Sequence, residues 1–279
     1  MTTRILDFAD HRRDLGDNRH VYAVVSRRAR GLSIGLNLNA DKVCNFDCPY
    51  CQVDRTTPGG PAAVDVARLS EELERLLGWV ADGTLWDHPP FDTAAPAFRR
   101  VADLAFAGDG EPTSAIAFPE AVTAVRTLRD RYGLAVPVRL LTNATLLHRS
   151  RVRAALPGVD DIWCKLDAGT EAYFRVVDGT TFPFARILRN LRELAQERPI
   201  VIQTMFCAMS GAGPDADEQA AWASRLAEIL EAGGRIAEVQ VYTVARRPSD
   251  ARVAPLDAAT LEAIAARARA LGLTVSVHG

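Results

Sequence analysis

The sequence predicts an α/β protein in which parallel strands, each followed by a helix, form a partial (β/α)6 barrel of the TIM type. Three observations predict this fold. Apolar strand-like segments alternate with amphipathic helical segments, which is typical of a parallel sheet covered by helices. The alternation gives six strand–helix units and a closing strand, fewer than the eight units of a full barrel. Glycine-rich and polar segments come directly after strands, where barrels of this kind bind their ligands.

The strands are expected where apolar runs lie between turn signals. They fall at residues 31–39, 101–107, 136–143, 161–167, 199–207, 236–244 and 273–278. The first helix follows a Pro/Gly-rich stretch at 56–64 and carries an apolar stripe with the helical period, formed by Leu69, Leu73, Leu76, Leu77 and Val80. Residues 87–98 are expected to form a loop because of their prolines.

The remaining helices are expected between the later strands, at 116–132, shortly after 143, and at 184–198, 218–232 and 257–271. Gly233 and Gly234 end one of them, and Asp257 is a suitable N-cap for the last. No second domain, repeat or low-complexity tract interrupts the pattern. We therefore expect a single domain over residues 1–279, with a core from about residue 20 and residues 1–19 as an N-terminal extension.

Composition excludes several classes of protein. With 48% hydrophobic and 24% charged residues, the chain can bury a full core. Its net charge of −2 gives no general attraction to nucleic acids or anionic membranes. The N-terminus lacks the apolar core of a signal peptide, and no apolar run approaches membrane-spanning length. Together with free cysteines, these features predict a protein of the reducing cytoplasm.

Three cysteines in the run KVCNFDCPYC are the strongest functional signal. Cys44, Cys48 and Cys51 have the spacing CxxxCxxC directly after the first predicted strand. A [4Fe–4S] cluster normally takes four cysteines, so three would leave one iron open to a ligand.

A structural zinc is the main alternative, but it needs a second ligand pair downstream. Only Cys164 and Cys207 remain, far apart, and no histidine pair has zinc spacing. A disulfide framework is less favoured still, because five cysteines cannot staple a chain of 279 residues.

The CxxxCxxC motif at this position resembles the radical S-adenosylmethionine (radical SAM) superfamily, and the resemblance covers most of the chain. It implies that Cys44, Cys48 and Cys51 hold a [4Fe–4S] cluster whose open iron is chelated by S-adenosylmethionine. One electron would cleave this cofactor to methionine and a 5′-deoxyadenosyl radical, which takes hydrogen from a substrate. Tyr50, the aromatic residue before the last cysteine, would lie near the adenine or shield the cluster from water.

A second motif, GDGE, follows the strand at 101–107. In the family a glycine-rich motif at this place meets the methionine ammonium group of the cofactor. The resemblance therefore predicts that Gly108, Asp109, Gly110 and Glu111 bind the cofactor, although Asp109 departs from the simpler family pattern. Glycines permit close backbone approach, and the carboxylate of Glu111 would complement a cation. Without the cysteines, the same residues would be read as a turn.

Polar residues at the ends of later strands are weaker candidates. Thr142 and Asn143 end the third strand. In DIWCKLD, alternation places Lys165 and Asp167 on one face, which we expect to point inward, and Cys164 on the outer face. Lys165 would then pair with a carboxylate and Asp167 would accept from ribose hydroxyls. The alternative is a structural ion pair.

The last candidates come from the two strands that follow. Gln203 and Cys207 share a face, and a thiol there would donate hydrogen to a substrate radical or be a buried structural cysteine. Tyr242 and Arg246 end the sixth strand, where the family contacts adenine or substrate, and Arg246 and Arg247 are candidate anion binders. A surface role for the arginines is an equal alternative.

Among radical SAM proteins, the segments LNLNADKVCNFDCPYCQVDR, AGDGEPT, LLTNAT and KLDAGT most resemble the wyosine-synthase-like group. The chain lacks the further cysteines and basic surfaces of true wyosine synthases, so tRNA is a possible but not a favoured substrate. The resemblance implies a radical SAM enzyme acting on a small-molecule or nucleotide-like substrate, with flavodoxin or ferredoxin as electron donor. Two alternatives stay open: an activase that makes a glycyl radical on a partner protein, and a non-enzymatic Fe–S or zinc module.

Overall fold

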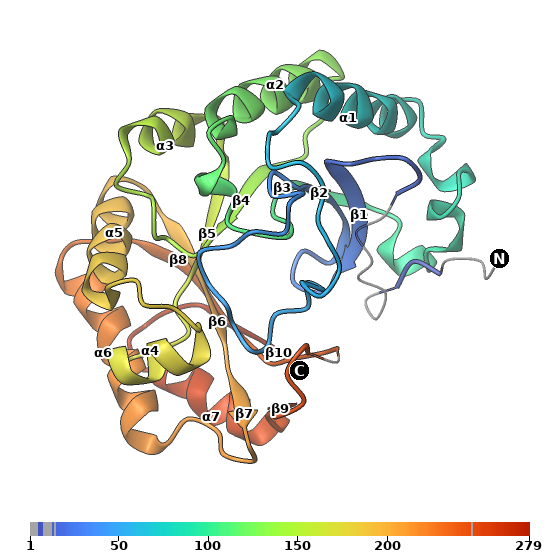
Figure 1. Cartoon of the computed structure of the whole chain (residues 1–279). Coiled ribbons are helices and arrows are strands. Elements are labelled where there is room, and N and C mark those ends of the chain that lie inside the picture. The colour runs from blue at the N-terminus through green and yellow to red at the C-terminus, as the bar shows by residue number, and fades with distance from the viewer. Residues whose placement is uncertain (1–4, 8–12, 14, 247) are drawn as a thin grey trace. The chain divides into compact units, whose positions relative to one another are not determined.

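The structure is a computed structural model that describes residues 5–7, 13, 15–246 and 248–279 (Figure 1). Its described residues divide into two compact units. The first unit takes the chain up to Val43 together with Pro58–Leu141 and Arg149–Asp161. The second takes Cys44–Thr57, Thr142–His148 and Ile162–Gly279. Each unit has its own strands, helices and buried core.

The first unit is built on neighbouring strands in the order β1-β2-β3-β4. β1 (Val21–Ser26) runs antiparallel to β2 (Gly31–Leu36). β2 is parallel to β3 (Val101–Phe106), and β3 is parallel to β4 (Val138–Thr142), whose last residue belongs to the second unit. Every residue of β2 is buried, as expected for a central strand with both faces covered.

Three helices cover the strands of the first unit. α1 (Val66–Ala81) begins after Asp65, whose side chain accepts a hydrogen bond from the Arg68 backbone N–H. Its leucine stripe is buried, and α2 (Phe118–Arg131) lies beside it (Figure 1). α3 (Ser150–Ala155) packs on α2. Short 3-10 turns occupy Leu85–Asp87, Phe91–Thr93, Pro96–Phe98, Pro112–Ser114 and Leu156–Gly158.

The second unit has parallel strands in the order β5-β6-β8-β10. They are β5 (Asp161–Lys165), whose first residue belongs to the first unit, β6 (Ile200–Met205), β8 (Ile236–Tyr242) and β10 (Val275–His278). A separate antiparallel pair is formed by β7 (Cys207–Met209) and β9 (Val253–Pro255). Three of the candidate residues described below, Lys165, Gln203 and Tyr242, lie in β5, β6 and β8, toward the carboxyl ends of these strands.

Four helices belong to the second unit: α4 (Glu171–Val177), α5 (Phe184–Glu197), α6 (Ala216–Glu231) and α7 (Ala258–Arg269). α6 packs between α5 and α7. Trp222 of α6 is fully buried and meets Phe206 edge to face, with ring centroids 5.3 Å apart. Asp257 caps α7 through the Thr260 N–H, which confirms the predicted N-cap.

The predicted order of elements is confirmed, because β2, β3, β4, β5, β6 and β8 are each followed by a helix and β10 closes the chain. The strand predicted over 199–207 is wrong in its extent: β6 ends at Met205, and Cys207 begins β7. β1, α4 and the β7–β9 pair were not predicted. The single domain stays a prediction. None of the helices in the described part of the chain combines the length and apolar composition needed to cross a membrane.

Candidate functional site

The three cysteines lie on one loop that opens the second unit. Cys44, Cys48 and Cys51 are free thiols of intermediate exposure. The Cys51 N–H donates to the Cys48 carbonyl over 2.8 Å, which makes a tight turn between these two candidate ligands. Burial raises the pKa of the Cys48 thiol well above its ordinary value. Among the described residues, no group of three His, Cys, Asp or Glu side chains surrounds a single ion position.

The loop is held by hydrogen bonds from residues far away in the sequence. Asn45 donates to the Thr145 hydroxyl over 2.7 Å and accepts from the Asn143 side chain over 2.7 Å. Phe46 packs edge to face on Phe174 of α4, with ring centroids 5.6 Å apart. Asn143 therefore positions the cysteine loop, a role that strand-end polarity alone did not identify.

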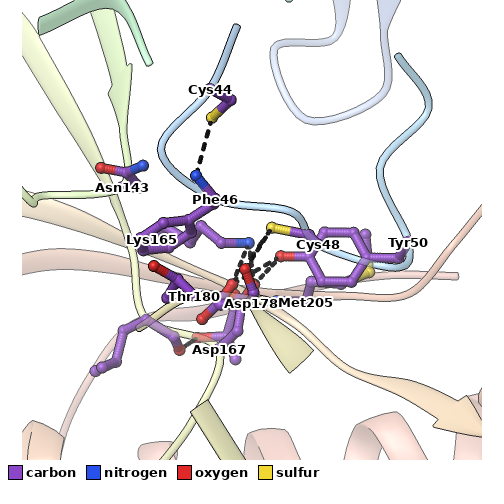
Figure 2. A network of polar contacts seen from close by, with 12 residues as sticks. Cys44, Phe46, Cys48, Tyr50, Asn143, Lys165, Asp167, Asp178, Thr180 and Met205 are labelled. Carbon is purple, nitrogen blue, oxygen red and sulfur yellow. Dashed lines mark hydrogen bonds and ion pairs between the residues drawn. The ribbon is translucent and has the colours of Figure 1, made fainter. Parts of the chain in front are cut away.

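A buried ionic network lies beside Cys48 (Figure 2). Lys165 Nζ contacts a carboxylate oxygen of Asp167 and lies 2.9 Å from Asp178 Oδ1. The Tyr50 hydroxyl donates to Asp167 and lies 3.4 Å from Asp178 Oδ1, and Lys165 Nζ stands 4.3 Å from the centre of the Tyr50 ring. Cys48 Sγ is 3.6 Å from Asp178 Oδ1. In Figure 2, Cys44 lies apart from this group.

Two carboxylates share one lysine in this network. Burial raises the pKa of Asp178 to about 7, although Lys165 acts to lower it. Burial likewise raises the pKa of Asp167. Burial would lower the pKa of Lys165, but Asp167 and Asp178 raise it well above its ordinary value. The structural ion pair considered as an alternative for Lys165 and Asp167 is thus present, and their cofactor contacts stay a prediction.

The GDGE motif belongs to the first unit, where its glycines have no room for a side chain. A Cβ on Gly108 would lie 2.3 Å from Asn37 Oδ1, and one on Gly110 would lie 2.2 Å from the Val43 carbonyl oxygen. The two glycines thus let Asn37 and Val43 of the first unit approach closely, while the predicted approach of the glycine backbone to a cofactor stays a prediction.

The two acids of the motif have partners within the first unit. Asp109 pairs with Arg13 and accepts from the Asn37 amide over 2.7 Å. The buried carboxylate of Glu111 accepts from the Thr113 N–H over 3.2 Å and so caps the next turn. The turn function is present, and cofactor binding by Gly108, Asp109, Gly110 and Glu111 stays a prediction.

The other candidates lie at strand ends of the second unit. Thr142 Oγ1 accepts from the Ala144 N–H over 3.1 Å. Gln203 donates to the Gln240 side chain over 2.8 Å, away from bulk water. Arg246 lies 3.4 Å from Gln52, next to Cys51, whereas Arg247 lies outside the described residues. Tyr242 ends β8, and its charge makes a small contribution to the raised pKa of Lys165.

Cys207 is fully buried at the start of β7, and Cys164 is fully buried in β5. Burial raises the pKa of Cys207 to about 12, and the charge of Asp167 adds to this. The Cys207 thiol therefore keeps its proton at neutral pH. Whether it donates a hydrogen atom stays a prediction.

Sequence reasoning missed Asp178, the residue at the end of α4 that contacts Cys48, Lys165 and Tyr50. It also missed Tyr173, whose hydroxyl is buried without a hydrogen-bond partner among the described residues. No usable signal for Asp178 was present in the sequence, because α4, the short helix that it follows, was not predicted.

Tyr173 leads to a prediction about stability. Replacing Tyr173 with phenylalanine removes a buried hydroxyl that no described group satisfies, so we expect the free energy of unfolding to rise by about 1 kcal/mol. Tyr50→Phe should lower it, because the Tyr50 hydroxyl donates to Asp167. Urea unfolding of both variants measures the direction of each change in the free energy of unfolding. A Tyr173→Phe protein less stable than wild type would show that the Tyr173 hydroxyl is hydrogen-bonded.

We compared the chain with protein families, curated proteins and solved structures. No family model matches the chain. A UPF0026 protein of Synechocystis is 30% identical over 156 residues (53% of this chain, 48% of that protein). A UPF0026 protein of Methanocaldococcus jannaschii is 27% identical over 160 residues (56% and 43%). The GTPase Obg of Brachyspira hyodysenteriae is 23% identical over 160 residues (57% and 21%). The chain thus spans less than half the length of these curated relatives.

Solved structures give a wider match. A radical SAM methyltransferase from Sphaerobacter thermophilus has a TM-score of 0.63 at 12% identity, covering 92% of this chain and 69% of its own. Streptococcus suis SuiB bound to S-adenosylmethionine has a TM-score of 0.58 at 15% identity (91% and 52%). TYW1 with a lysine–pyruvate adduct has a TM-score of 0.53 at 13% identity (90% and 84%).

The class that follows is that of the radical SAM fold. The likeness over nine-tenths of the chain confirms the predicted partial parallel barrel and the resemblance to radical SAM enzymes at the level of the fold. TYW1 is among the proteins with this fold.

Proposed function

We propose that this protein is a radical SAM enzyme in which Cys44, Cys48 and Cys51 hold a [4Fe–4S] cluster and leave one iron open for S-adenosylmethionine. The observation that carries the proposal is the set of three cysteines on one loop, none of them in a disulfide bond, with the loop held in place by buried partners of the second unit. Three cysteine ligands suit a cluster with one open position. When bound, such a cluster supplies the electron that cleaves S-adenosylmethionine to methionine and a 5′-deoxyadenosyl radical.

The chain's own residues would prepare the site in distinct ways. Lys165 and Tyr50 both contact Asp167, and these contacts would tie the cysteine loop to the strand ends beside Cys48. The glycines at 108 and 110 would let backbone carbonyls approach a ligand cation, and Glu111 would add a carboxylate. Cys207, with its retained proton, would provide a hydrogen atom to a substrate radical.

We further propose a small-molecule or nucleotide-like substrate and an electron donor such as flavodoxin or ferredoxin, within the cytoplasm. The near-neutral charge of the chain supports a substrate other than tRNA. The SuiB structure bound to S-adenosylmethionine supports the cofactor, because a chain of the same fold accommodates it.

The test is anaerobic reconstitution with iron and sulfide, followed by reduction in the presence of S-adenosylmethionine. We expect about four irons per chain and release of 5′-deoxyadenosine. Cys48→Ala should lose both, because two thiols do not retain the cluster. Cys164→Ala is the matched control, since this buried thiol lies in β5, outside the loop, and cluster and product should persist. One zinc per chain without 5′-deoxyadenosine, or a cluster retained in Cys48→Ala, would contradict the proposal.

Glu111→Gln separates cofactor binding from turn formation. The amide oxygen of glutamine can still accept from Thr113, while the negative charge is lost. We expect the cluster to assemble normally and S-adenosylmethionine to bind about tenfold more weakly, as measured by equilibrium dialysis of the reconstituted protein. Glu120→Gln, on the exposed face of α2, is the control. If Glu111→Gln binds S-adenosylmethionine as tightly as wild type, Glu111 serves only to cap the turn.

A further inference from the structure

The segment formed by Asp178, Gly179 and Thr180 follows α4 and contacts the cysteine loop with each of its residues. We propose that these residues form a clamp that holds the part of the loop between Cys44 and Cys48 in place, with Asp178 as the positioning residue for Cys48. This inference rests on the proposed function, because it gives the clamp the task of retaining the cluster. Below, "the clamp" means residues 178–180.

Asp178 contacts the loop through its backbone as well as its side chain. Its carbonyl oxygen accepts from the Asp47 N–H over 3.3 Å. The same carbonyl oxygen and the carboxylate Oδ1 each lie 3.6 Å from Cys48 Sγ. A single residue thus fixes both the candidate ligand and the residue before it, across 130 positions of sequence.

The carboxylate of Asp178 also joins the loop to the sheet. It is paired with Lys165 of β5, which in turn contacts Asp167, and Asp167 Oδ1 accepts from the Met205 N–H of β6 over 2.8 Å. Figure 2 shows Cys48, Tyr50 and Lys165 converging on the two carboxylates. The position of Cys48 is therefore coupled to two strands through buried polar contacts, which hold their geometry better than exposed ones.

Gly179 and Thr180 extend the contact along the loop. Gly179 has φ +57°, and a Cβ there would lie 2.0 Å from the Asp47 carbonyl oxygen, so only glycine allows this approach. Thr180 Oγ1 donates to the Asn45 carbonyl over 3.2 Å. The clamp thus reaches residues on both sides of Phe46, between the first two candidate ligands.

Asp178 is a second carboxylate beside a lysine that already has one. Lys165 is already paired with Asp167, so a second buried carboxylate is not needed to satisfy it. Burying an additional carboxyl group is costly, which argues that its place beside Cys48 has a purpose. It also means that Asp178 can be replaced without leaving Lys165 unpaired, so the variants below are expected to fold.

The experiment compares Asp178→Ala, Asp178→Asn and Thr180→Val with Thr181→Val, a matched control at an exposed neighbouring position. Hydrogen exchange of the loop amides is followed in the apoprotein, and iron loss to a chelator is followed after reconstitution. We expect Asp178→Ala to speed exchange of the loop amides around Cys48, whose contact with the carboxylate is lost, and to lose iron roughly 10–100-fold faster than wild type. The Asp47 amide should change less, because its acceptor is the backbone carbonyl of residue 178. Thr180→Val should show a smaller change in the same direction, and Thr181→Val none.

Asp178→Asn tests positioning against general stability, because asparagine keeps the size and an acceptor oxygen. It should recover most of the exchange protection and part of the iron retention. The electron paramagnetic resonance (EPR) spectrum of its reduced cluster should differ from that of wild type, a signature that a purely structural role would not move.

Two outcomes overturn the inference in distinguishable ways. If wild type holds the cluster and Asp178→Ala retains iron and amide protection equally well, the clamp is wrong and the proposed function stands. If wild type takes up no iron, the proposed function fails, and the clamp fails with it as a cluster-retaining device. If Asp178→Ala does not fold, Asp178→Asn and Thr180→Val test the clamp instead, by the same measurements of hydrogen exchange and iron loss.

Discussion

Replacing Lys165 with methionine is expected to destabilise the apoprotein by about 3–5 kcal/mol, because it leaves Asp167 and Asp178 buried together without their cation. Methionine has nearly the same length, so the loss is electrostatic and not one of packing volume. Urea unfolding at neutral pH measures the effect. The destabilisation should shrink as the pH is lowered, because protonation neutralises the carboxyl groups, whose pKa values burial already raises.

Two further variants make the Lys165 result specific. Lys165→Met combined with Asp178→Asn should regain much of the lost stability, since only one buried carboxylate then lacks a cation. Arg189→Met, at an exposed position of α5, should change stability by less than about 0.5 kcal/mol. A Lys165→Met protein as stable as wild type would show that the two buried carboxyl groups do not need the charge of Lys165.

Glu72→Ala is expected to destabilise the first unit by about 3 kcal/mol. The buried carboxylate of Glu72 on α1 accepts from the backbone N–H groups of Arg19, His20 and Val21, at 2.7, 2.8 and 3.0 Å, and from the Arg68 side chain at 2.8 Å. Alanine would leave these donors at the start of β1 without their acceptor. Thermal unfolding measures the loss of stability. Glu71→Ala, at the exposed position just before Glu72 on α1, is the control.

Glu72 also predicts a pH dependence. Burial would raise the pKa of Glu72, but the hydrogen bonds from Arg19, Arg68, His20 and Val21 lower it below its ordinary value. Its contribution is therefore present above the unfolded pKa and is lost as the pH falls through the lowered folded pKa. The stability difference between wild type and Glu72→Ala should shrink over this acidic range. An unchanged difference would contradict the assigned role.

The alternation of strands and helices could be predicted because apolar periodicity is a local property of the sequence. The buried leucine stripe of α1 and the cap at Asp257 follow from local rules of this kind. β1 was missed because the turn that joins it to β2 lacks Gly or Asn and contains arginines, with Arg30 at φ +54°. That sequence is typical of a charged loop.

The candidate site was predicted only where chemistry is encoded in spacing. The three cysteines carry their meaning within eight residues, so they could be found. Asp178 could not, because its contact with Cys48 spans 130 positions and depends on where a short, unpredicted helix ends. Asn143 was noticed as a polar strand end, but its hydrogen bond to Asn45 appears only once the loop is folded.

The central claim is that three cysteines hold a cluster with one iron left for S-adenosylmethionine. The most direct measurement is the EPR spectrum of the reduced, reconstituted protein before and after S-adenosylmethionine is added. We predict a signal of a reduced [4Fe–4S] cluster whose g-values shift when the cofactor is added, because the open iron gains a ligand. A spectrum that does not respond to the cofactor, or the absence of a cluster signal, would contradict the account.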